Sequence, residues 1–404
     1  MNASPSRRTF LGGVAAAGLA YSAMPAIGGP GANEAIRVGV IGTGGRARGL
    51  MKTLGSMPGV KIVAVADVYD VALDMGRKLA DPSALVTKAY REVLDRKDVD
   101  AVLIGTPDHW HAAMTVAACQ AGKDVYVEKP LTHSIEEGAG VIAAQNAHAR
   151  VVQVGTQQRS MPQFIKAREL VRSGRLGKVF KVHMTWNRNV GGQVARSASN
   201  IDPKQVDWKA FLGNAPDQPF DPYKVTGNWR WFWDFGGGVL TDLMVHWLDA
   251  AHWLLDLDHP DRATAFGTRQ VAGTTWETPD SVQSFLEYPG GLTASFEATF
   301  SNAHRGALME LMGTDATLYL DRGRFELVPE RGKGAPESMV LGEGPRGRDF
   351  YDVPDGERLH LAHWLDCIRT RAKPNAPAEA GVAAAAAAHL ANRALRSGQV
   401  ASWS

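Results

Sequence analysis

Three ionisable residues have the types and spacing that proton transfer at a hydroxyl group requires. Lys129 follows the apolar run DVYV, while Asp242 and His246 lie four residues apart in VLTDLMVHWLDAAHWLLD. Residues four apart share one face of a helix, where a carboxylate can orient an imidazole and raise its basicity. A histidine titrates near neutrality and can take a hydroxyl proton, and a lysine can hydrogen-bond the same hydroxyl. Taken alone, these residues also fit a surface lysine and a helix salt bridge or core histidine.

A glycine-rich segment predicts a dinucleotide site. In GVIGTGGRARG, Gly42 and Gly44 fit the first two glycines of G-x-G-x-x-G, and Ala47 takes the third place. The first glycine permits a tight turn, and the second lets backbone N–H groups approach a pyrophosphate at the helix N-terminus. Asp67 ends the next predicted strand, where a carboxylate suits the ribose hydroxyls and disfavours a 2′-phosphate. We therefore expect NAD, with NADP as the alternative because two arginines follow the glycines.

The elements that must position these residues alternate between strand and helix. Five apolar runs without polar alternation are the predicted strands: 36–42, 61–67, 100–106, 124–130 and 150–156. Helical stretches, among them 71–80 and 111–122, lie between them. This order indicates βαβ units, and unbroken apolar runs indicate strands that are buried on both faces. We predict an α/β, doubly wound parallel sheet of the Rossmann type over 33–157.

The pattern changes after about residue 160, which predicts a second domain over 158–404. Longer, partly alternating strands with hairpin turns are expected in three segments: 178–187, 281–300 and 307–321. They predict a mainly antiparallel sheet in an α+β domain, with a long helix over 239–256 and a last helix over about 377–397 that could pack back on the first domain. Residues 188–238 form a long tryptophan-containing connection, typical of a functional segment. Residues 329–358 are interpreted as an exposed loop.

Four segments together resemble a known family. They are GTPDHWH (105–111), YVEKPLT (126–132), VGTQQRS (154–160) and GGGVLTDLMVHWLD (236–249). In this order they resemble the Gfo/Idh/MocA oxidoreductases, a group named partly for glucose–fructose oxidoreductase. The resemblance implies a Rossmann domain followed by an open-faced antiparallel sheet domain, and nicotinamide chemistry on sugars or polyols. It also implies that the chain forms a homodimer or homotetramer, because the exposed sheet face usually pairs.

The resemblance implies roles for individual residues. The catalytic set is Lys129, Asp242 as the carboxylate, and His246 as the acid/base; some relatives with closed sugar-to-sugar cycles have tyrosine at that last position, which counts against that subgroup. Combined with the glycine motif, the expected cofactor-binding residues are Gly42, Thr43, Gly44, Arg46, Asp67, Thr106, Pro107, Asp108, His111, Glu128, Lys129 and Gln157.

A substrate pocket is expected where aromatic faces can pack on a sugar ring and arginine and asparagine can bind hydroxyls. The candidates are Arg159, Asn187, Arg188, Trp229, Arg230 and His246. Core packing or a subunit interface would explain the tryptophans in 228–235 nearly as well. His109 and His111 form an H-x-H pair, but no acidic or cysteine partner stands out, so no metal site is predicted.

The first residues, MNASPSRRTFLGG, predict export. Arg7 and Arg8 precede an uncharged stretch that is rich in alanine and glycine, which is typical of a twin-arginine signal peptide, here assigned to 1–32. A membrane anchor would need about 20 strongly apolar residues, whereas this stretch reaches Pro25 early. The twin-arginine (Tat) route carries folded proteins, so the leader predicts Tat export machinery as a partner, a periplasmic location and a cofactor that is loaded before export.

Bulk composition fits a globular enzyme. The chain is 45% hydrophobic and 21% charged with a net charge of +2, so no nucleic-acid partner is implied. The leading hypothesis is an exported NAD(P)-dependent oxidoreductase that acts on a sugar or glycoside by hydride transfer and recycles a tightly bound cofactor. One alternative is an NAD-dependent glycosidase-like enzyme that uses transient oxidation. Another is a non-catalytic sugar-binding protein, and a third, a cytoplasmic sugar dehydrogenase, requires the leader to be misread.

Overall fold

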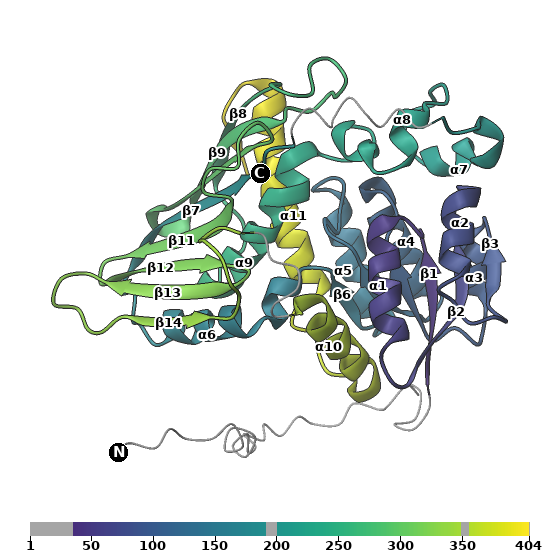
Figure 1. The fold of residues 1–404 in the computed structure, drawn as a ribbon, viewed down its shortest axis with the longest axis horizontal. Coiled ribbons are helices and arrows are strands. Elements are labelled where there is room, and N and C mark those ends of the chain that lie inside the picture. The colour runs from purple at the N-terminus through teal and green to yellow at the C-terminus, as the bar shows by residue number, and fades with distance from the viewer. Residues whose placement is uncertain (1–34, 191–199, 349–354, 404) are drawn as a thin grey trace.

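The computed structural model describes residues 35–190, 200–348 and 355–403, and the predicted leader lies outside them. Two sheets stand on opposite sides of the molecule, with helices between and around them (Figure 1). The first sheet is parallel and the second is mainly antiparallel, which confirms the predicted fold class.

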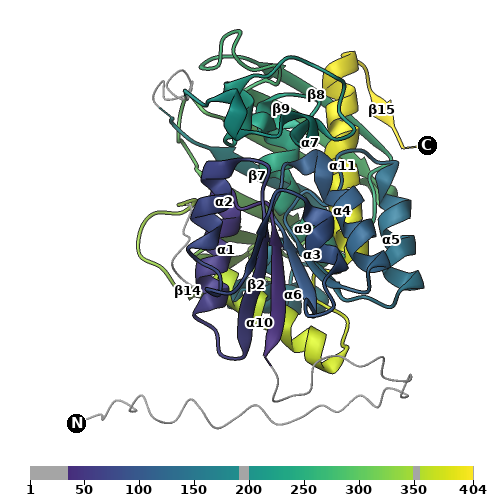
Figure 2. The same ribbon diagram turned by 90° about the vertical axis from the view of Figure 1, so that its right-hand side faces the viewer.

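The parallel sheet has the strand order β3-β2-β1-β4-β5-β6. Its strands are β1 (Ile36–Ile41), β2 (Val60–Ala66), β3 (Leu85–Thr87), β4 (Ala101–Ile104), β5 (Asp124–Val127) and β6 (Val152–Val154). Its helices are α1 (Gly45–Gly55), α2 (Asp70–Arg77), α3 (Tyr90–Asp95), α4 (Asp108–Gln120) and α5 (Glu137–Ala147). Helices α1 and α2 lie on one face, and α3, α4 and α5 lie on the other (Figure 2). The chain changes direction between β1 and β4, which opens a crevice at their carboxyl ends.

The second sheet has nine strands in the order β14-β13-β12-β11-β7-β10-β9-β8-β15. They are β7 (Val179–Asn187), β8 (Arg262–Thr268), β9 (Ser281–Tyr288), β10 (Leu292–Thr299), β11 (Ala307–Gly313), β12 (Ala316–Asp321), β13 (Arg324–Pro329), β14 (Glu337–Val340) and β15 (Ala401–Ser402). Only β7 and β10 pair in parallel. Side chains alternate along β8, β9 and β10, so one face packs inward while the other exposes residues such as Phe266 of β8 and Phe285 of β9.

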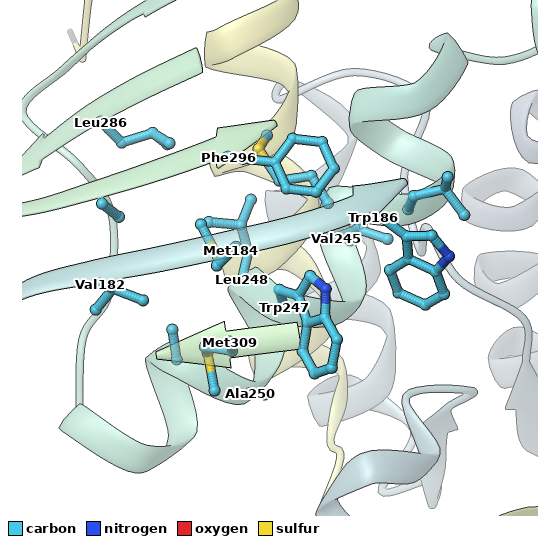
Figure 3. Packing of buried hydrophobic residues seen from close by; sticks show 14 of the residues in the cluster. Val182, Met184, Trp186, Val245, Trp247, Leu248, Ala250, Leu286, Phe296 and Met309 are labelled. Carbon is cyan, nitrogen blue, oxygen red and sulfur yellow. The ribbon is translucent and has the colours of Figure 1, made fainter. Parts of the chain in front are cut away.

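Helices cover the inner face of the second sheet. They include α6 (Pro162–Arg172), the π-helical turn η5 (Leu240–Met244) and α9 (Val245–Leu255). Figure 3 shows Val182 and Met184 of β7 in the buried cluster that also contains Val245 and Leu248 of α9. This packing places η5 and the start of α9 against β7.

The C-terminal chain returns to the Rossmann domain. Helix α10 (Gly356–Thr370) shares a buried cluster with α1, in which Trp364 and Leu361 accompany Leu50. Helix α11 (Ala378–Ser397) contacts α5, α9 and β8, so it runs between the two domains. Its predicted span over about 377–397 agrees closely with the structure.

Three details differ from the sequence expectations. The predicted single helix over 239–256 begins as the π-helical turn η5, whose wider spacing changes which side chains share a face. The predicted loop over 329–358 contains β14 and the start of α10. Strand β3 has only three residues, too few for a periodic signal to reveal it. Within the described ranges, no helix combines the length and apolarity needed to cross a membrane.

Candidate active site

A large cavity of about 1220 Å³ lies along the carboxyl ends of the parallel strands. Its wall begins at the glycine loop after β1 and continues past the segments that follow β2, β4 and β5. It ends against η5, the end of β7 and the turn between β12 and β13. One elongated cavity therefore joins the predicted dinucleotide site to the predicted catalytic residues.

The glycine loop has the shape that a pyrophosphate needs. Gly42 adopts φ +79°, and an added Cβ would lie only 2.8 Å from the backbone of Gly105 and Thr106. Gly44 is the N-cap of α1, and the space where a Cβ would stand is open. Backbone N–H groups at this helix start therefore face space that phosphate oxygens can enter, so the residues fit a dinucleotide.

Asp67 is held firmly at the end of β2. Its carboxylate accepts hydrogen bonds from Thr43 N at 2.7 Å, Thr43 Oγ1 at 3.1 Å and Tyr69 N at 2.9 Å. Burial raises the pKa of Asp67 above its ordinary value, although these hydrogen bonds oppose the rise. Asp67 lines the cavity, whereas Thr43 does not; Thr43 instead positions the carboxylate.

Arg46 is engaged by two carboxylates. Its Nε donates to Glu128 at 2.8 Å, and its Nη1 donates to Glu357 of α10. Although burial opposes the change, Glu128 raises the pKa of Arg46 above its ordinary value. Both Arg46 and Glu128 line the cavity, but their charges are largely satisfied by these ion pairs.

Lys129 and Asp242 form an ion pair in the wall of the cavity. Lys129 Nζ donates to the Asp242 carboxylate and to the Asp242 backbone carbonyl, each at 2.7 Å. Arg230 Nε donates to the same carboxylate at 3.3 Å. Burial alone would raise the pKa of Asp242, but Lys129 and Arg230 lower it below its ordinary value. An ammonium group has three donors, so Lys129 keeps one N–H for a group in the cavity.

His246 lies beside this pair without pairing to Asp242. The hydrogen bonds of Asp242 in the described structure go to Lys129 and Arg230, so the carboxylate positions the lysine instead of the imidazole. Burial and then the charge of Lys129 lower the pKa of His246 well below its ordinary value. The expectation that Asp242 orients His246 and raises its basicity is therefore wrong, because the Asp242 carboxylate accepts its hydrogen bonds from Lys129 and Arg230. The neutral imidazole is nevertheless the form that accepts a proton.

The H-x-H pair joins loops together. His111 places Nδ1 2.7 Å from the carbonyl oxygen of Pro130 and Nε2 3.0 Å from that of Thr106, which connects the segments after β4 and β5. His109 Nε2 lies 3.0 Å from the carbonyl oxygen of Phe211. Across the described residues, no group of three metal-ligating side chains comes close enough to hold an ion.

Residues 200–235 form a strap that crosses from the second domain over the cavity. The strap contains η3 (Pro203–Gln205), α7 (Trp208–Leu212), α8 (Pro222–Val225) and η4 (Asn228–Trp231). Figure 1 shows α7 and α8 beyond the ends of α2 and α4, next to the Rossmann domain. Residues 207–214 and 225–230 supply part of the cavity wall.

Hydrogen bonds attach the strap to the Rossmann domain at several places, and one of them runs from His109 N to the carbonyl of Phe235 at 3.3 Å. Asp207 N donates to the carbonyl of Val68 at 2.9 Å, next to the bridge between Tyr69 and Val206. Trp110 Nε1 donates to the carbonyl of Phe211 at 3.0 Å. The strap is therefore fixed to the Rossmann domain where it contributes to the cavity wall.

Most of the predicted site residues meet in this cavity. Those that line it are Gly42, Gly44, Arg46, Asp67, Thr106, Pro107, Asp108, His111, Glu128, Lys129, Gln157, Arg188, Trp229, Arg230, Asp242 and His246. Arg159 lies outside, because its guanidinium is buried against Asp249 at 2.8 Å. Asn187 also lies outside and donates to the carbonyl of His304 at 2.8 Å. The substrate-binding role predicted for these two side chains does not fit their placement.

Trp186 and Arg322 are among the wall residues that sequence reasoning overlooked. Side chains alternate along an extended chain, so Trp186 near the end of β7 and Arg188 just after it both reach the cavity, whereas Asn187 between them does not. From that alternation, Trp186 could have been predicted as a pocket residue in place of Asn187. Arg322 lies in the turn between β12 and β13, and nothing in its local sequence indicates that this turn reaches the site.

Two family models match this chain in the order of its two domains. One, described as an oxidoreductase family with an NAD-binding Rossmann fold, matches residues 36–156. The other, the GFO/IDH/MocA C-terminal domain, matches residues 164–319. Together they cover more than half of the sequence. The chain belongs to the Gfo/Idh/MocA oxidoreductase family. The family resemblance is thereby confirmed, and the protein is an NAD(P)-dependent oxidoreductase of this type.

Individual Gfo/Idh/MocA proteins give more detailed comparisons. Inositol 2-dehydrogenase 1 from Saccharopolyspora erythraea is 28% identical over 90% of this chain and 95% of its own length. A glycosyl hydrolase family 109 protein from Solibacter usitatus is 38% identical over only 26% of each chain. The solved structure of levoglucosan dehydrogenase with NADH and levoglucosan has a TM-score of 0.70 at 18% identity, covering 91% of this chain and 99% of that one. At this identity the structural likeness shows the shared fold.

Proposed function

We propose that this protein is an exported oxidoreductase that oxidises a hydroxyl group of a sugar or polyol and keeps its nicotinamide cofactor bound between turnovers. The observation that carries the proposal is the position of Lys129, Asp242 and His246 in the cavity that begins at the glycine loop. The similarity to an inositol dehydrogenase and a levoglucosan dehydrogenase supports a carbohydrate or polyol substrate.

The side chains divide the proton chemistry between them. Lys129 is held by Asp242 and directs its remaining N–H at the oxygen of the reacting hydroxyl. His246 is neutral and accepts the proton from that hydroxyl as the carbon–oxygen double bond forms. The residues of the glycine loop and Asp67 would hold a nicotinamide dinucleotide, which would supply the redox chemistry as the acceptor of the hydride.

NAD is the proposed cofactor. The Asp67 carboxylate sits where a ribose is bound in this fold, and a 2′-phosphate would face a negative charge there. Arg46 is engaged by Glu128 and Glu357, and Arg48 Nη1 donates to the carbonyl of Thr43 at 2.6 Å. Neither guanidinium is therefore positioned mainly for a phosphate. NADP is the alternative, and identification of the released nucleotide distinguishes the two.

Tight retention of the cofactor is proposed from the strap and the leader together. The strap forms part of the cavity wall and is joined to the Rossmann domain through contacts with Val68, Trp110 and Tyr69, which supports slow release of a bound dinucleotide. The periplasm is not expected to hold a free NAD pool, so an exported enzyme needs to retain its cofactor and reoxidise it with a second substrate.

A second candidate function is glycoside cleavage through transient oxidation. The local likeness to a glycosyl hydrolase family 109 protein favours it. A transient ketone acidifies the neighbouring C–H, so elimination becomes feasible with modest acid and base groups before the same hydride returns. A glycoside that is cleaved with no net change in bound NAD(H) supports this candidate over net sugar oxidation.

The test begins with the purified protein. Its denatured extract should release NAD(H), and a panel of sugars and polyols should include one that reduces the bound cofactor. Replacing Lys129→Met or His246→Ala should slow that reduction by roughly 10²- to 10⁴-fold, the usual contribution of general acid–base groups. If both variants react at the unchanged rate, these residues are not catalytic. If no cofactor is bound and NAD is consumed at every turnover, the proposal that the cofactor stays bound and is reoxidised on the enzyme fails, while the oxidoreductase assignment stands.

A further inference from the structure

The first turn of α4 brings one acidic side chain to the cavity. Asp108 is the first residue of this helix, is only 4% exposed and lines the cavity wall. It does not cap the helix, because Pro107 occupies the N-cap position and no side-chain capping hydrogen bond forms there. Among the described residues, no group forms a hydrogen bond with the Asp108 carboxyl group.

The other side chains of this turn do form hydrogen bonds. His109 Nε2 and Trp110 Nε1 each lie 3.0 Å from the carbonyl oxygen of Phe211. His111 lies within hydrogen-bond distance of two further backbone carbonyl groups. These three side chains join loops, whereas Asp108 joins nothing. Buried polar groups are nearly always hydrogen-bonded, so a ligand in the cavity is the natural partner for this carboxyl group.

The charged side chains that act on Asp108 belong mainly to the catalytic end of the cavity. Arg230 of η4 and Lys129 after β5 act on it as cations. Asp242 of η5 acts on it as an anion, and Glu128 is a second anion with a smaller effect. Three of these four groups form the hydrogen-bonded cluster around the catalytic carboxylate. Asp108 therefore borders the region where the substrate reacts.

Burial keeps the carboxyl group of Asp108 neutral. The loss of hydration raises its pKa to about 8; the two cations oppose this rise, and the two anions add to it. At neutral pH the side chain is mostly a carboxylic acid, which has an O–H donor that a carboxylate lacks. Enzymes use carboxylic acids that burial keeps neutral as hydrogen-bond donors.

We propose that Asp108 binds an oxygen of the sugar or polyol by donating a hydrogen bond from its neutral carboxyl group. This inference rests on the proposed function, since it adds a substrate-binding residue to the same site. Lys129 and His246 act on the reacting hydroxyl, whereas Asp108 fixes how the substrate lies beside them. The cofactor-binding role expected from the sequence is the alternative that the experiment decides.

The experiment compares variants of the holoenzyme with whichever of myo-inositol, glucose and levoglucosan reduces the bound cofactor fastest. Asp108→Leu is similar in size but has no donor, so kcat/KM should fall by about 10- to 100-fold. Asp108→Asn keeps an N–H donor and should recover part of that loss. Asp70→Asn is the matched control and should change kcat/KM little. Asp70 is the first residue of α2, but its side chain is 44% exposed and pairs with Lys88.

The pH profile separates a hydrogen-bond donor from a structural residue. Wild-type Asp108 loses its proton as the pH rises through about 8. Above that pH, kcat/KM of the wild type should fall relative to Asp108→Asn by up to about 10-fold per pH unit, because only the wild type loses its donor.

Proton uptake gives a second measurement that does not depend on turnover. A substrate that accepts the hydrogen bond stabilises the protonated acid, so binding at about pH 8.5 should take up part of a proton. Calorimetric titration in two buffers with different ionisation enthalpies measures this uptake. The reduced holoenzyme is used, since it cannot oxidise the sugar. Asp108→Asn should take up no proton.

Deoxy sugars identify the acceptor. Each monodeoxy derivative of the active sugar lacks one hydroxyl group. The wild type should react about 10- to 100-fold more slowly with the derivative that lacks the hydroxyl bound by Asp108. Asp108→Leu should distinguish this derivative from the parent sugar by much less, because the variant no longer makes the contact.

Three results would overturn the inference. If every deoxy sugar loses the same factor in the wild type and in Asp108→Leu, Asp108 does not bind the substrate, and loss of nicotinamide from the variant on dialysis would identify the cofactor as the acceptor. If the ratio of wild type to Asp108→Asn is constant from about pH 6 to pH 9, Asp108 is not a neutral donor. Both results leave the oxidoreductase proposal standing. If no sugar reduces the bound cofactor, the proposed function fails and this inference fails with it.

Discussion

Asp108 shows how one buried residue can make stability depend on pH. It is 4% exposed in the first turn of α4 and lines the cavity near Lys129 and Arg230. Burial raises its pKa to about 8, well above the value of about 3.9 for an exposed aspartate. Between about pH 4 and pH 8 the folded chain therefore binds more protons at this site than the unfolded chain. Stability falls as the pH rises through that window.

Replacing Asp108→Asn should remove this dependence. The variant should gain stability relative to the wild type as the pH increases, by up to about 1.4 kcal/mol per pH unit within the window. Urea unfolding of both proteins, measured without substrate at about pH 5 and pH 8, gives the difference in free energy of unfolding between the variant and the wild type at each pH. Equal differences at the two pH values would mean that Asp108 is ionised at both.

Arg159 illustrates a residue whose sequence context suggested binding but whose contacts are structural. Its Nε donates to Asp249 at 2.8 Å, and the Asp249 side chain is fully buried. Arg159→Met should lower the free energy of unfolding by about 3–5 kcal/mol, because it leaves a buried carboxylate unpaired. The substrate KM should stay near the wild-type value.

A more exposed ion pair provides the control for that experiment. Arg168 pairs with Asp256, whose side chain is 62% exposed, so Arg168→Met should cost only about 0–1 kcal/mol. Chemical denaturation compares the two variants. A large rise in KM for Arg159→Met with little loss of stability would restore its predicted substrate role.

At the scale of elements, η5 carries Asp242 of the catalytic site, and the strap forms part of the cavity wall. The π-helical turn places the Asp242 carboxylate on Lys129, and the packing of α9 against β7 keeps it there. The strap approaches the Rossmann domain so closely that Gly213 leaves no room for a side chain. An added Cβ at Gly213, where φ is +57°, would lie 2.2 Å from the Trp110 ring.

Gly213→Ala should therefore push the strap away from Trp110 and speed the loss of the cofactor. The fraction of bound nicotinamide after prolonged dialysis measures this loss. Gly290→Ala is the matched control, because Gly290 has φ +80° in a hairpin but open space around its Cβ position. The control carries the same backbone strain without touching the strap. Equal retention in both variants would mean that the strap does not hold the cofactor.

At the scale of the whole molecule, export remains a proposal that depends on the first residues of the chain. Arg7→Lys combined with Arg8→Lys should keep the protein in the cytoplasm, because the twin-arginine route reads both residues. Cell fractionation and N-terminal sequencing of the mature protein measure the outcome. Unchanged export of the double variant would point to another route. It would also weaken the reason for a retained cofactor.

The predicted homodimer or homotetramer also stays a prediction at this scale. The outer face of the second sheet exposes Phe180, Phe266 and Phe285, which suits a face that pairs with another surface. Helices α6 and α9 pack on the inner face of this sheet, whereas these phenylalanine side chains stay exposed in the single chain.

The sequence alone determined the parts that depend on local order. The Rossmann domain could be predicted from the apolar runs and the glycine spacing around Gly42, because strand burial and turn geometry depend on neighbouring residues. The catalytic lysine could be predicted from the EKP segment at Lys129, which is part of the resemblance to the family. Tertiary structure decided the contacts between distant residues. It placed Arg322 beside Trp186, engaged Arg46 with Glu357, and turned Asp242 toward Lys129. Such contacts depend on how separate elements pack, and no local pattern records that packing.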